Sequence, residues 1–200
     1  MILLDVSGSF VESEAYPHAL VQLSNLLPQL DTELPHPMRV RVLPVGNVHR
    51  QALCDIYVPS YSPFESRCPQ DGMEHQFNQC RQALEVPKKD RFTDIDGALD
   101  RAVLELGVPT PDQVRLISLV SDLEQDRPPG APAASANLSR TCVLNIYDHD
   151  PSNEGLLERV EYWEKRQRKL GGVVSSQPLR GLNMGLVLRF IKECTTHVNE

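Results

Sequence analysis

The chain has 200 residues, the ordinary size of a single domain with an adequate core, and we treat residues 1–200 as one domain. Its formal net charge is −7, with 27 acidic against 20 basic side chains, so it lacks the broad basic surface that a nucleic-acid partner requires. No stretch approaches the roughly 20 apolar residues that cross a bilayer, and we expect no membrane insertion.

Short apolar runs alternate with stretches of helical periodicity along the whole chain. The runs that predict strands are Met1–Asp5, Arg39–Val45, Ala52–Val58, Val114–Ser121, Thr141–Tyr147 and Gly172–Ser175. The stretches that predict helices are Glu14–Leu30, Met73–Leu84, Asp94–Leu106, Ser152–Leu170 and Asn183–Thr196. This alternation predicts an α/β fold, a three-layer Rossmann-like sandwich in which helices cover both faces of a mostly parallel central sheet.

The second and third predicted strands depart from this alternation. Only residues 46–51 join them, and a link that short cannot make a parallel crossover. We therefore expect an antiparallel hairpin with one strand at the edge of the sheet. The stretches 59–71 and 128–132, rich in proline with serine or glycine, are predicted to be irregular.

The five cysteines are an odd number and contain no Cys-x-x-Cys pair, which argues against a zinc site. Cys142 lies within an apolar run and is predicted to be a core residue. Cys68 and Cys80 flank one loop-to-helix segment and would form a disulfide only in an oxidising compartment. We expect reduced structural thiols.

The first predicted strand ends in a polar turn that has two interpretations. Asp5, Ser7 and Ser9 place one carboxylate and two hydroxyls on a tight loop, and such hard oxygen donors suit Mg²⁺ or Mn²⁺. The same residues also suit the N-cap of a helix. The loop is not a phosphate cradle, because it holds one glycine and no following Lys-Ser or Lys-Thr.

Two further segments are predicted to reach the same edge of the sheet. Asp122 follows the apolar run that ends at Ser121, and Thr93 stands at the start of a predicted helix. Because the loops after parallel strands gather at one edge, where ligands bind, both should lie near Asp5. Each also has a purely structural interpretation, Thr93 as the helix N-cap and Asp122 as a cap on the following turn.

Taken together, Asp5-x-Ser7-x-Ser9, Thr93 opening a Thr-Asp-Ile-x-x-Ala-Leu helix, and Asp122 after an apolar strand resemble the metal-ion-dependent adhesion site of the von Willebrand factor type A (vWA) family. The likeness extends over essentially the whole chain. It implies a metal-dependent protein-binding module in which a bound Mg²⁺ or Mn²⁺ accepts an Asp or Glu side chain from a partner protein. It also implies that the three hydroxyls contact the metal directly and that Asp5 and Asp122 act mainly through water.

Two positions depart from the family pattern. The family often has glycines just before the threonine and just after the third-loop aspartate, whereas Arg91 and Phe92 precede Thr93 and Leu123 follows Asp122. Bulkier neighbours would narrow the approach to the metal. Further carboxylates are expected near the same edge, from Glu124 and Asp126 and from the segment 148–150, where we expect an exposed polar loop.

Two other functions remain open at the level of sequence. The opening residues also resemble PIN-type metal-dependent nucleases, in which Asp5, Asp96 and Asp122 would hold the metal ions, but that assignment leaves Ser9 and Thr93 without a role. The alternative is a vWA-type scaffold with a vestigial site. No nucleophile–base pair stands out, so we do not predict an enzyme. The compartment depends on the start of the chain: cytoplasmic if Met1 is the native start, periplasmic or secreted if an upstream signal has been removed.

Overall fold

The fold is described from a computed structural model. It describes residues 1–34, 36–46, 51–60, 68, 72–110, 113, 115–131, 135–148 and 155–199. The strands are β1 (Ile2–Asp5), β2 (Met38–Val45), β3 (Cys54–Val58), β4 (Arg115–Ser121), β5 (Thr141–Tyr147) and β6 (Val173–Pro178). The helices are α1 (Gly8–Glu12), α2 (Ala15–Glu33), α3 (Met73–Glu85), α4 (Ile95–Leu106), α5 (Leu156–Lys169) and α6 (Met184–Asn199).

The strands form one six-stranded sheet in the order β3-β2-β1-β4-β5-β6. All neighbours pair in parallel except β2 and β3, which pair antiparallel and place β3 at one edge. The predicted fold class and the predicted edge hairpin are therefore confirmed. β1 occupies the middle of the sheet, and its four residues are all buried because strands pair on both its sides and helices cover both its faces.

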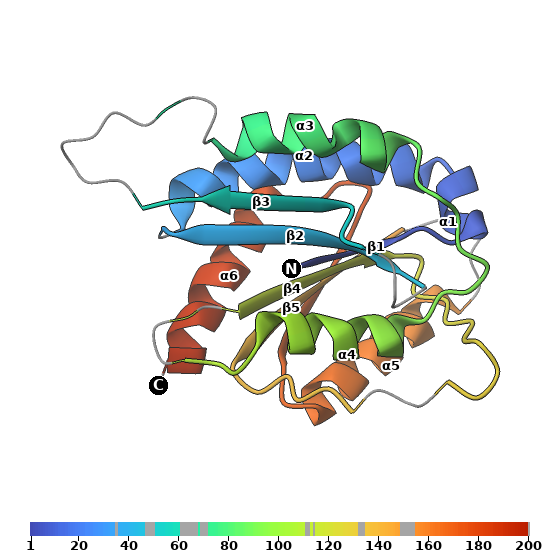
Figure 1. The fold of residues 1–200 in the computed structure, drawn as a ribbon. Coiled ribbons are helices and arrows are strands. Elements are labelled where there is room, and N and C mark those ends of the chain that lie inside the picture. The colour runs from blue at the N-terminus through green and yellow to red at the C-terminus, as the bar shows by residue number, and fades with distance from the viewer. Residues whose placement is uncertain are drawn as a thin grey trace.

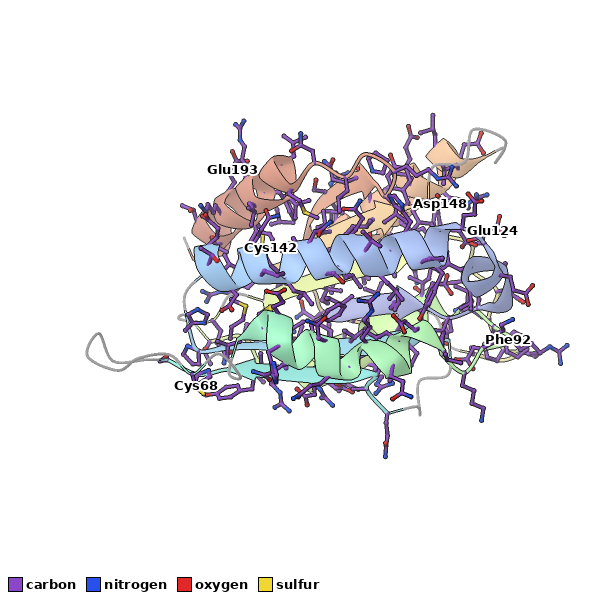
Figure 2. The ribbon with its side chains drawn as sticks, turned by 90° about the horizontal axis from the view of Figure 1, so that it is seen from above. Cys68, Phe92, Glu124, Cys142, Asp148 and Glu193 are labelled. Atoms are coloured by element: carbon purple, nitrogen blue, oxygen red, sulfur yellow. A yellow bond between two sulfur atoms is a disulfide. The ribbon has the colours of Figure 1, made fainter. Side chains whose placement is uncertain are left out.

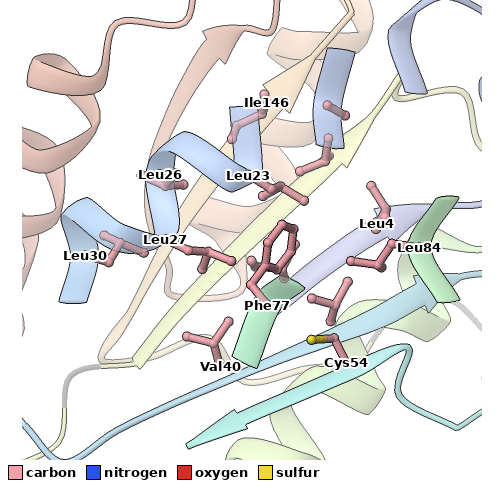
Figure 3. Packing of buried hydrophobic residues seen from close by; sticks show 14 of the residues in the cluster. Leu4, Leu23, Leu26, Leu27, Leu30, Val40, Cys54, Phe77, Leu84 and Ile146 are labelled. Atoms are coloured by element: carbon pink, nitrogen blue, oxygen red, sulfur yellow. The ribbon is translucent and has the colours of Figure 1, made fainter. Parts of the chain in front are cut away.

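Helices cover both faces of the sheet (Figure 1). On one face α1, α2, α3 and α6 enclose the larger apolar core, and on the other α4 and α5 enclose the second. Figure 3 shows how α2 contributes to the larger core through Leu23, Leu26, Leu27 and Leu30, whose three- and four-residue spacing keeps them on one face of the helix. Burial of this stripe holds α2 against the sheet.

Among the described residues, helix α1 is the one element that the sequence pattern does not predict. Its five residues are too few to display an apolar period, and Phe10 is its single buried side chain. The other predicted helices and strands are present, with ends that differ by a few residues. Within the described ranges, no helix combines the length and the apolar character that crossing a bilayer demands.

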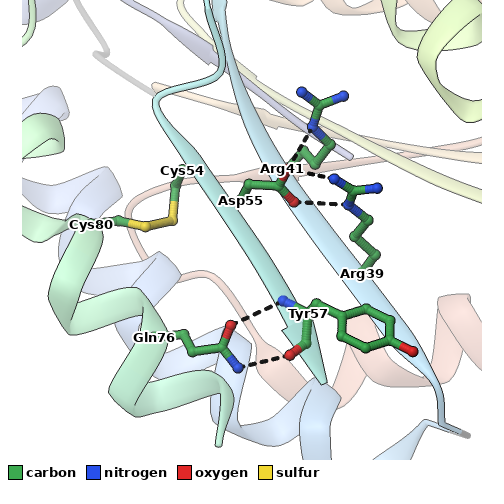
Figure 4. The surroundings of a disulfide bond; sticks show 7 residues. All are labelled: Arg39, Arg41, Cys54, Asp55, Tyr57, Gln76 and Cys80. Atoms are coloured by element: carbon green, nitrogen blue, oxygen red, sulfur yellow. Dashed lines mark hydrogen bonds and ion pairs between the residues drawn. A yellow bond between two sulfur atoms is a disulfide. The ribbon is translucent and has the colours of Figure 1, made fainter. Parts of the chain in front are cut away.

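The cysteines correct the expectation of reduced thiols. Cys54 and Cys80 form a disulfide between β3 and α3, with 5.4 Å between their Cα atoms (Figure 4). Cys142 and Cys194 form a second between β5 and α6, with Cα atoms 6.0 Å apart. Cys142 is buried as predicted, but Cys80 pairs with Cys54 rather than with Cys68, which is exposed and belongs to neither bridge. The pairing depends on β3 lying beneath α3, which cysteine spacing does not reveal.

Candidate metal site

Three loops meet at the carboxyl ends of β1 and β4. They are residues 5–9 after β1, residues 90–94 before α4, and residues 122–127 after β4. The amide of Asp90 donates to the carbonyl of Val6 at 2.9 Å, and Thr93 and Asp126 exchange two backbone hydrogen bonds of 2.9 and 3.0 Å. These bonds fix the three loops against one another.

A hollow opens between the three loops. Its lining consists of Ser7, Gly8, Ser9, Asp90, Arg91, Thr93, Glu124, Gln125 and Asp126. The three hydroxyl-bearing residues of the predicted site therefore face one hollow, although they come from loops more than eighty residues apart in sequence. Gly46, directly after β2, allows the middle loop to approach, because a Cβ atom there would lie 2.7 Å from the carbonyl oxygen of Phe92.

Asp5 lies fully buried behind the serines. Its Oδ1 accepts the Ser7 amide at 2.8 Å and its Oδ2 accepts the Ser121 hydroxyl at 2.7 Å. Burial raises the pKa of the Asp5 carboxyl, and the hydrogen bonds from Ser121 and Ser7 oppose that shift. Both carboxylate oxygens are therefore held in place before any ligand binds. Sequence reasoning missed Ser121, although a serine directly before Asp122 at the end of an apolar strand is a usable signal.

The two serine hydroxyls are spaced like neighbouring ligands of one small cation. Ser7 Oγ and Ser9 Oγ lie 3.2 Å apart and form a hydrogen bond with one another, which a cation bound by both would replace. Adjacent oxygens around Mg²⁺, each about 2.1 Å from the metal at right angles, lie about 3 Å from one another. Ser7 is also the N-cap of α1, where its Oγ accepts a long bond of 3.5 Å from the Phe10 amide. The capping interpretation and the metal interpretation of this turn are thus compatible.

Thr93 is not the helix cap that its position suggested. The N-cap of α4 is Asp94, whose Oδ1 accepts the Gly97 amide at 2.9 Å. The Thr93 side chain is buried and, among the described residues, its hydroxyl makes no hydrogen bond. Because Asp94 caps the helix, the Thr93 hydroxyl is available to a ligand in the hollow.

Asp122 is half-buried beside Asp5. Its Oδ1 accepts the Glu124 amide at 2.9 Å, so the predicted turn cap is present. Burial and, next, the negative charge of Asp5 raise the pKa of Asp122 to about 6. The carboxylates of Asp5 and Asp122, at the ends of adjacent strands, thus repel one another, and a divalent cation bound near them would lower that repulsion.

The two departures from the family pattern have different structural outcomes. Leu123 adopts the left-handed conformation with φ of 62°, which glycine reaches without steric cost, while its side chain is buried in the second core. Arg91 lines the hollow, and its guanidinium lies 5.2 Å from the centre of the Phe92 ring. Figure 2 shows Phe92 projecting outward at the same end of the molecule as Glu124. Phe92 itself is not part of the lining.

The other acidic residues of this edge are distributed unevenly. Glu124 and Asp126 line the hollow as expected, and Glu124 also forms an ion pair of 3.4 Å with Arg159. Asp148 instead pairs with Arg180 at 3.5 Å and is absent from the lining, while residues 149 and 150 lie outside the described residues. Asp90, which sequence reasoning missed, adds a third carboxylate to the wall.

The carboxylate that a nuclease would need is engaged elsewhere. Asp96 is buried and accepts hydrogen bonds from Arg166, Arg127 and Gln125, and it does not line the hollow. Within the described ranges, no three His, Cys, Asp or Glu side chains gather into a group that could hold a metal. The oxygen-bearing side chains that line the hollow include those of Ser7, Ser9 and Thr93 and the carboxylates of Asp90, Glu124 and Asp126, whereas Asp5 and Asp122 are not part of its lining.

Comparison with known proteins supports the fold alone. The chain is similar in structure to an aerotolerance-related membrane protein from Bacteroides fragilis NCTC 9343, solved with multiple mutations to serines. The TM-score is 0.51 at 15% sequence identity, over 98% of each chain. A conserved hypothetical protein, BatB from Bacteroides thetaiotaomicron, matches with a TM-score of 0.45 at 14% identity, over 98% of this chain and 97% of that one. No protein-family model and no curated protein sequence matches. The first of these neighbours supports the α/β fold, and the vWA resemblance of the metal site stays a prediction.

Proposed function

We propose that this chain is a vWA-type protein-binding module that acts through a divalent metal. Mg²⁺ or Mn²⁺ would be held by Asp5, Ser7, Ser9, Thr93 and Asp122, and would accept an Asp or Glu side chain from a partner protein. The observation that supports this proposal is the convergence of the three hydroxyl-bearing residues on one hollow, with Asp5 bonded to the Ser7 amide and Asp122 close enough to Asp5 for the two charges to interact.

The chemistry of these donors favours an acidic ligand. Hydroxyl oxygens are neutral, so three of them in direct contact leave most of the charge of the cation uncompensated. Asp5 and Asp122 would act through water or as hydrogen-bond acceptors, as the family resemblance implies. An open coordination position on such a metal attracts an anionic oxygen, and a carboxylate from another protein provides one.

Metal binding is tested first by its effect on stability. A ligand that binds only the native state at 100 times its dissociation constant stabilises it by about 2.7 kcal/mol, so Mg²⁺ should raise the melting temperature above that in EDTA. In Ser9→Ala this increase should shrink or vanish. Ser24→Ala is the matched control, because Ser24 lies on α2, away from the three loops, and its hydroxyl donates to the Leu20 carbonyl. A melting temperature indifferent to Mg²⁺, Mn²⁺ and EDTA would refute the proposed metal site.

Partner binding is tested by affinity capture on the immobilised chain. A specific partner should be retained in Mg²⁺ and released by EDTA, and Asp122→Ala should retain none. If the partner is still retained in EDTA and by Asp122→Ala, the result would favour the scaffold with a vestigial site. The proposal includes no catalytic step, so metal-dependent cleavage of RNA or DNA that is lost in Asp96→Ala would contradict it and support the nuclease.

A further inference from the structure

Asp96 is a buried carboxylate at the start of α4 that joins three elements. Its Oδ1 accepts a hydrogen bond from Nε of Arg166 on α5 at 2.9 Å and forms an ion pair with Nη2 of the same guanidinium at 2.8 Å. Its Oδ2 accepts hydrogen bonds from Gln125 Nε2 at 3.2 Å and from Arg127 Nη1 at 3.3 Å, and both residues belong to the loop after β4. Only 2% of the Asp96 side chain is exposed, against 24% of Arg166 and 31% of Arg127, so the carboxylate is shielded from water while its arginine partners reach the surface.

The contacts of Asp96 flank the point where two loops of the candidate site meet. Gln125 and Arg127 stand on either side of Asp126, whose backbone exchanges both hydrogen bonds with Thr93. The Gln125 side chain also accepts the Asp96 amide at 3.2 Å. Asp96 therefore holds residues 125 and 127 while Thr93, three residues before it, holds residue 126.

Helix α5 supports the same loop from behind. Arg159, Trp163 and Arg166 are spaced by four and three residues and so share one face of the helix. Arg159 pairs with Glu124 at 3.4 Å, and the Trp163 indole donates to the Leu123 carbonyl at 3.1 Å. The loop that carries Asp122 is thus fixed at Leu123 and Glu124 by α5, and at residues 125 and 127 by Asp96.

We propose that Asp96 is a positioning residue of the metal site, which through Arg166 and the 122–127 loop sets the places of Thr93 and Asp122. This inference rests on the proposed function for its ligand. A carboxylate that served only stability would be as useful anywhere between α4 and α5, whereas Asp96 contacts the two neighbours of the residue that pairs with Thr93. Removing its charge should therefore move the metal ligands.

The test combines one readout without metal and one with it. In EDTA, amide hydrogen exchange followed by NMR should become faster at Thr93 and Asp126 in Asp96→Asn, while the Ser7 amide, bonded to Asp5, should exchange as before. In Mg²⁺ titrations by calorimetry, the dissociation constant should rise by about 10- to 100-fold, the usual effect of losing a group that orients metal ligands. No cation is bound in EDTA. Faster exchange there therefore reports displacement of the loop, and not the loss of a negative charge near the cation.

Two further variants complete the design. Arg166→Gln should shift both readouts in the same direction as Asp96→Asn, and it serves if Asp96→Asn does not fold, since Arg127 and Gln125 still bond Asp96. Asp55→Asn is the control: it breaks another aspartate–arginine pair, with Arg39 at 2.6 Å on the β2–β3 hairpin (Figure 4), and should change neither readout.

The outcomes separate the two proposals. Unchanged exchange at Thr93 and Asp126, or unchanged Mg²⁺ affinity, in Asp96→Asn would overturn the role of Asp96 and leave the proposed function intact. Absence of Mg²⁺ binding by the unsubstituted protein would overturn the proposed function and this inference with it.

Discussion

Asp122→Asn should make the metal-free protein more stable at neutral pH, although it removes a residue of the candidate site. The pKa of Asp122 is raised from 3.8 to about 6 in the folded chain by burial and by the charge of Asp5. Asparagine keeps an oxygen that can accept the Glu124 amide but carries no charge to bury. The substitution therefore isolates the electrostatic cost of the carboxylate.

The sign and size of the effect follow from proton linkage. The folded state holds the Asp122 proton more tightly than the unfolded state, so the free energy of unfolding falls as pH rises from about 4 to about 6 and stays lower above that range. A rise in the pKa from 3.8 to about 6 corresponds to about 3 kcal/mol of unfolding free energy, and solvent screening at this half-buried side chain makes that an upper value. Below pH 4 the variant and the parent should be nearly equal in stability.

The assay is urea denaturation in EDTA from pH 4 to pH 8. The advantage of Asp122→Asn should grow across the range from pH 4 to pH 6 and then level off. Asp55→Asn should instead be less stable than the parent across this range, because a hydrogen bond from Arg39 lowers the pKa of Asp55 and the charged form already favours folding there. Added Mg²⁺ should raise the free energy of unfolding of the parent far more than that of Asp122→Asn. A variant no more stable than the parent at pH 7.5 in EDTA would refute this reasoning.

Three smaller predictions concern the scaffold. Replacing Cys142 and Cys194 by alanine should lower the free energy of unfolding by about 4 kcal/mol in the loop-closure model, since the bridge spans 52 residues, and urea denaturation would contradict this by showing no change. Tyr16→Phe removes a buried 2.6 Å hydrogen bond to a carbonyl of α3 and should cost about 1 kcal/mol, measured in the same way. The Gln76 side-chain amide bonds both the N–H and the carbonyl of Tyr57 on the edge strand (Figure 4). Gln76→Leu leaves these two backbone groups open to another chain and should promote self-association, measured by sedimentation velocity. A variant that does not self-associate would count against this role of Gln76.

The sequence by itself determined most of the fold and the composition of the candidate site. The run before Asp5 is apolar throughout, as a strand buried on both faces must be, and the spacing of leucines predicted the buried face of α2. The short link after Val45 indicated the antiparallel edge. These are local properties, in which residue order and chain length alone restrict the backbone.

Only the tertiary structure decided the contacts between distant segments. Cys80 pairs with Cys54 because α3 packs over β3, and Thr93 has no capping role because Asp94 is the N-cap of α4. Ser121 bonds Asp5 because β1 and β4 are neighbours in the sheet, and Asp96 faces Arg166 because α5 packs beside α4. No local pattern encodes such pairs, since each depends on how separate elements pack. The sequence thus named the donors of the candidate metal site, and the packing supplied the residues that hold them.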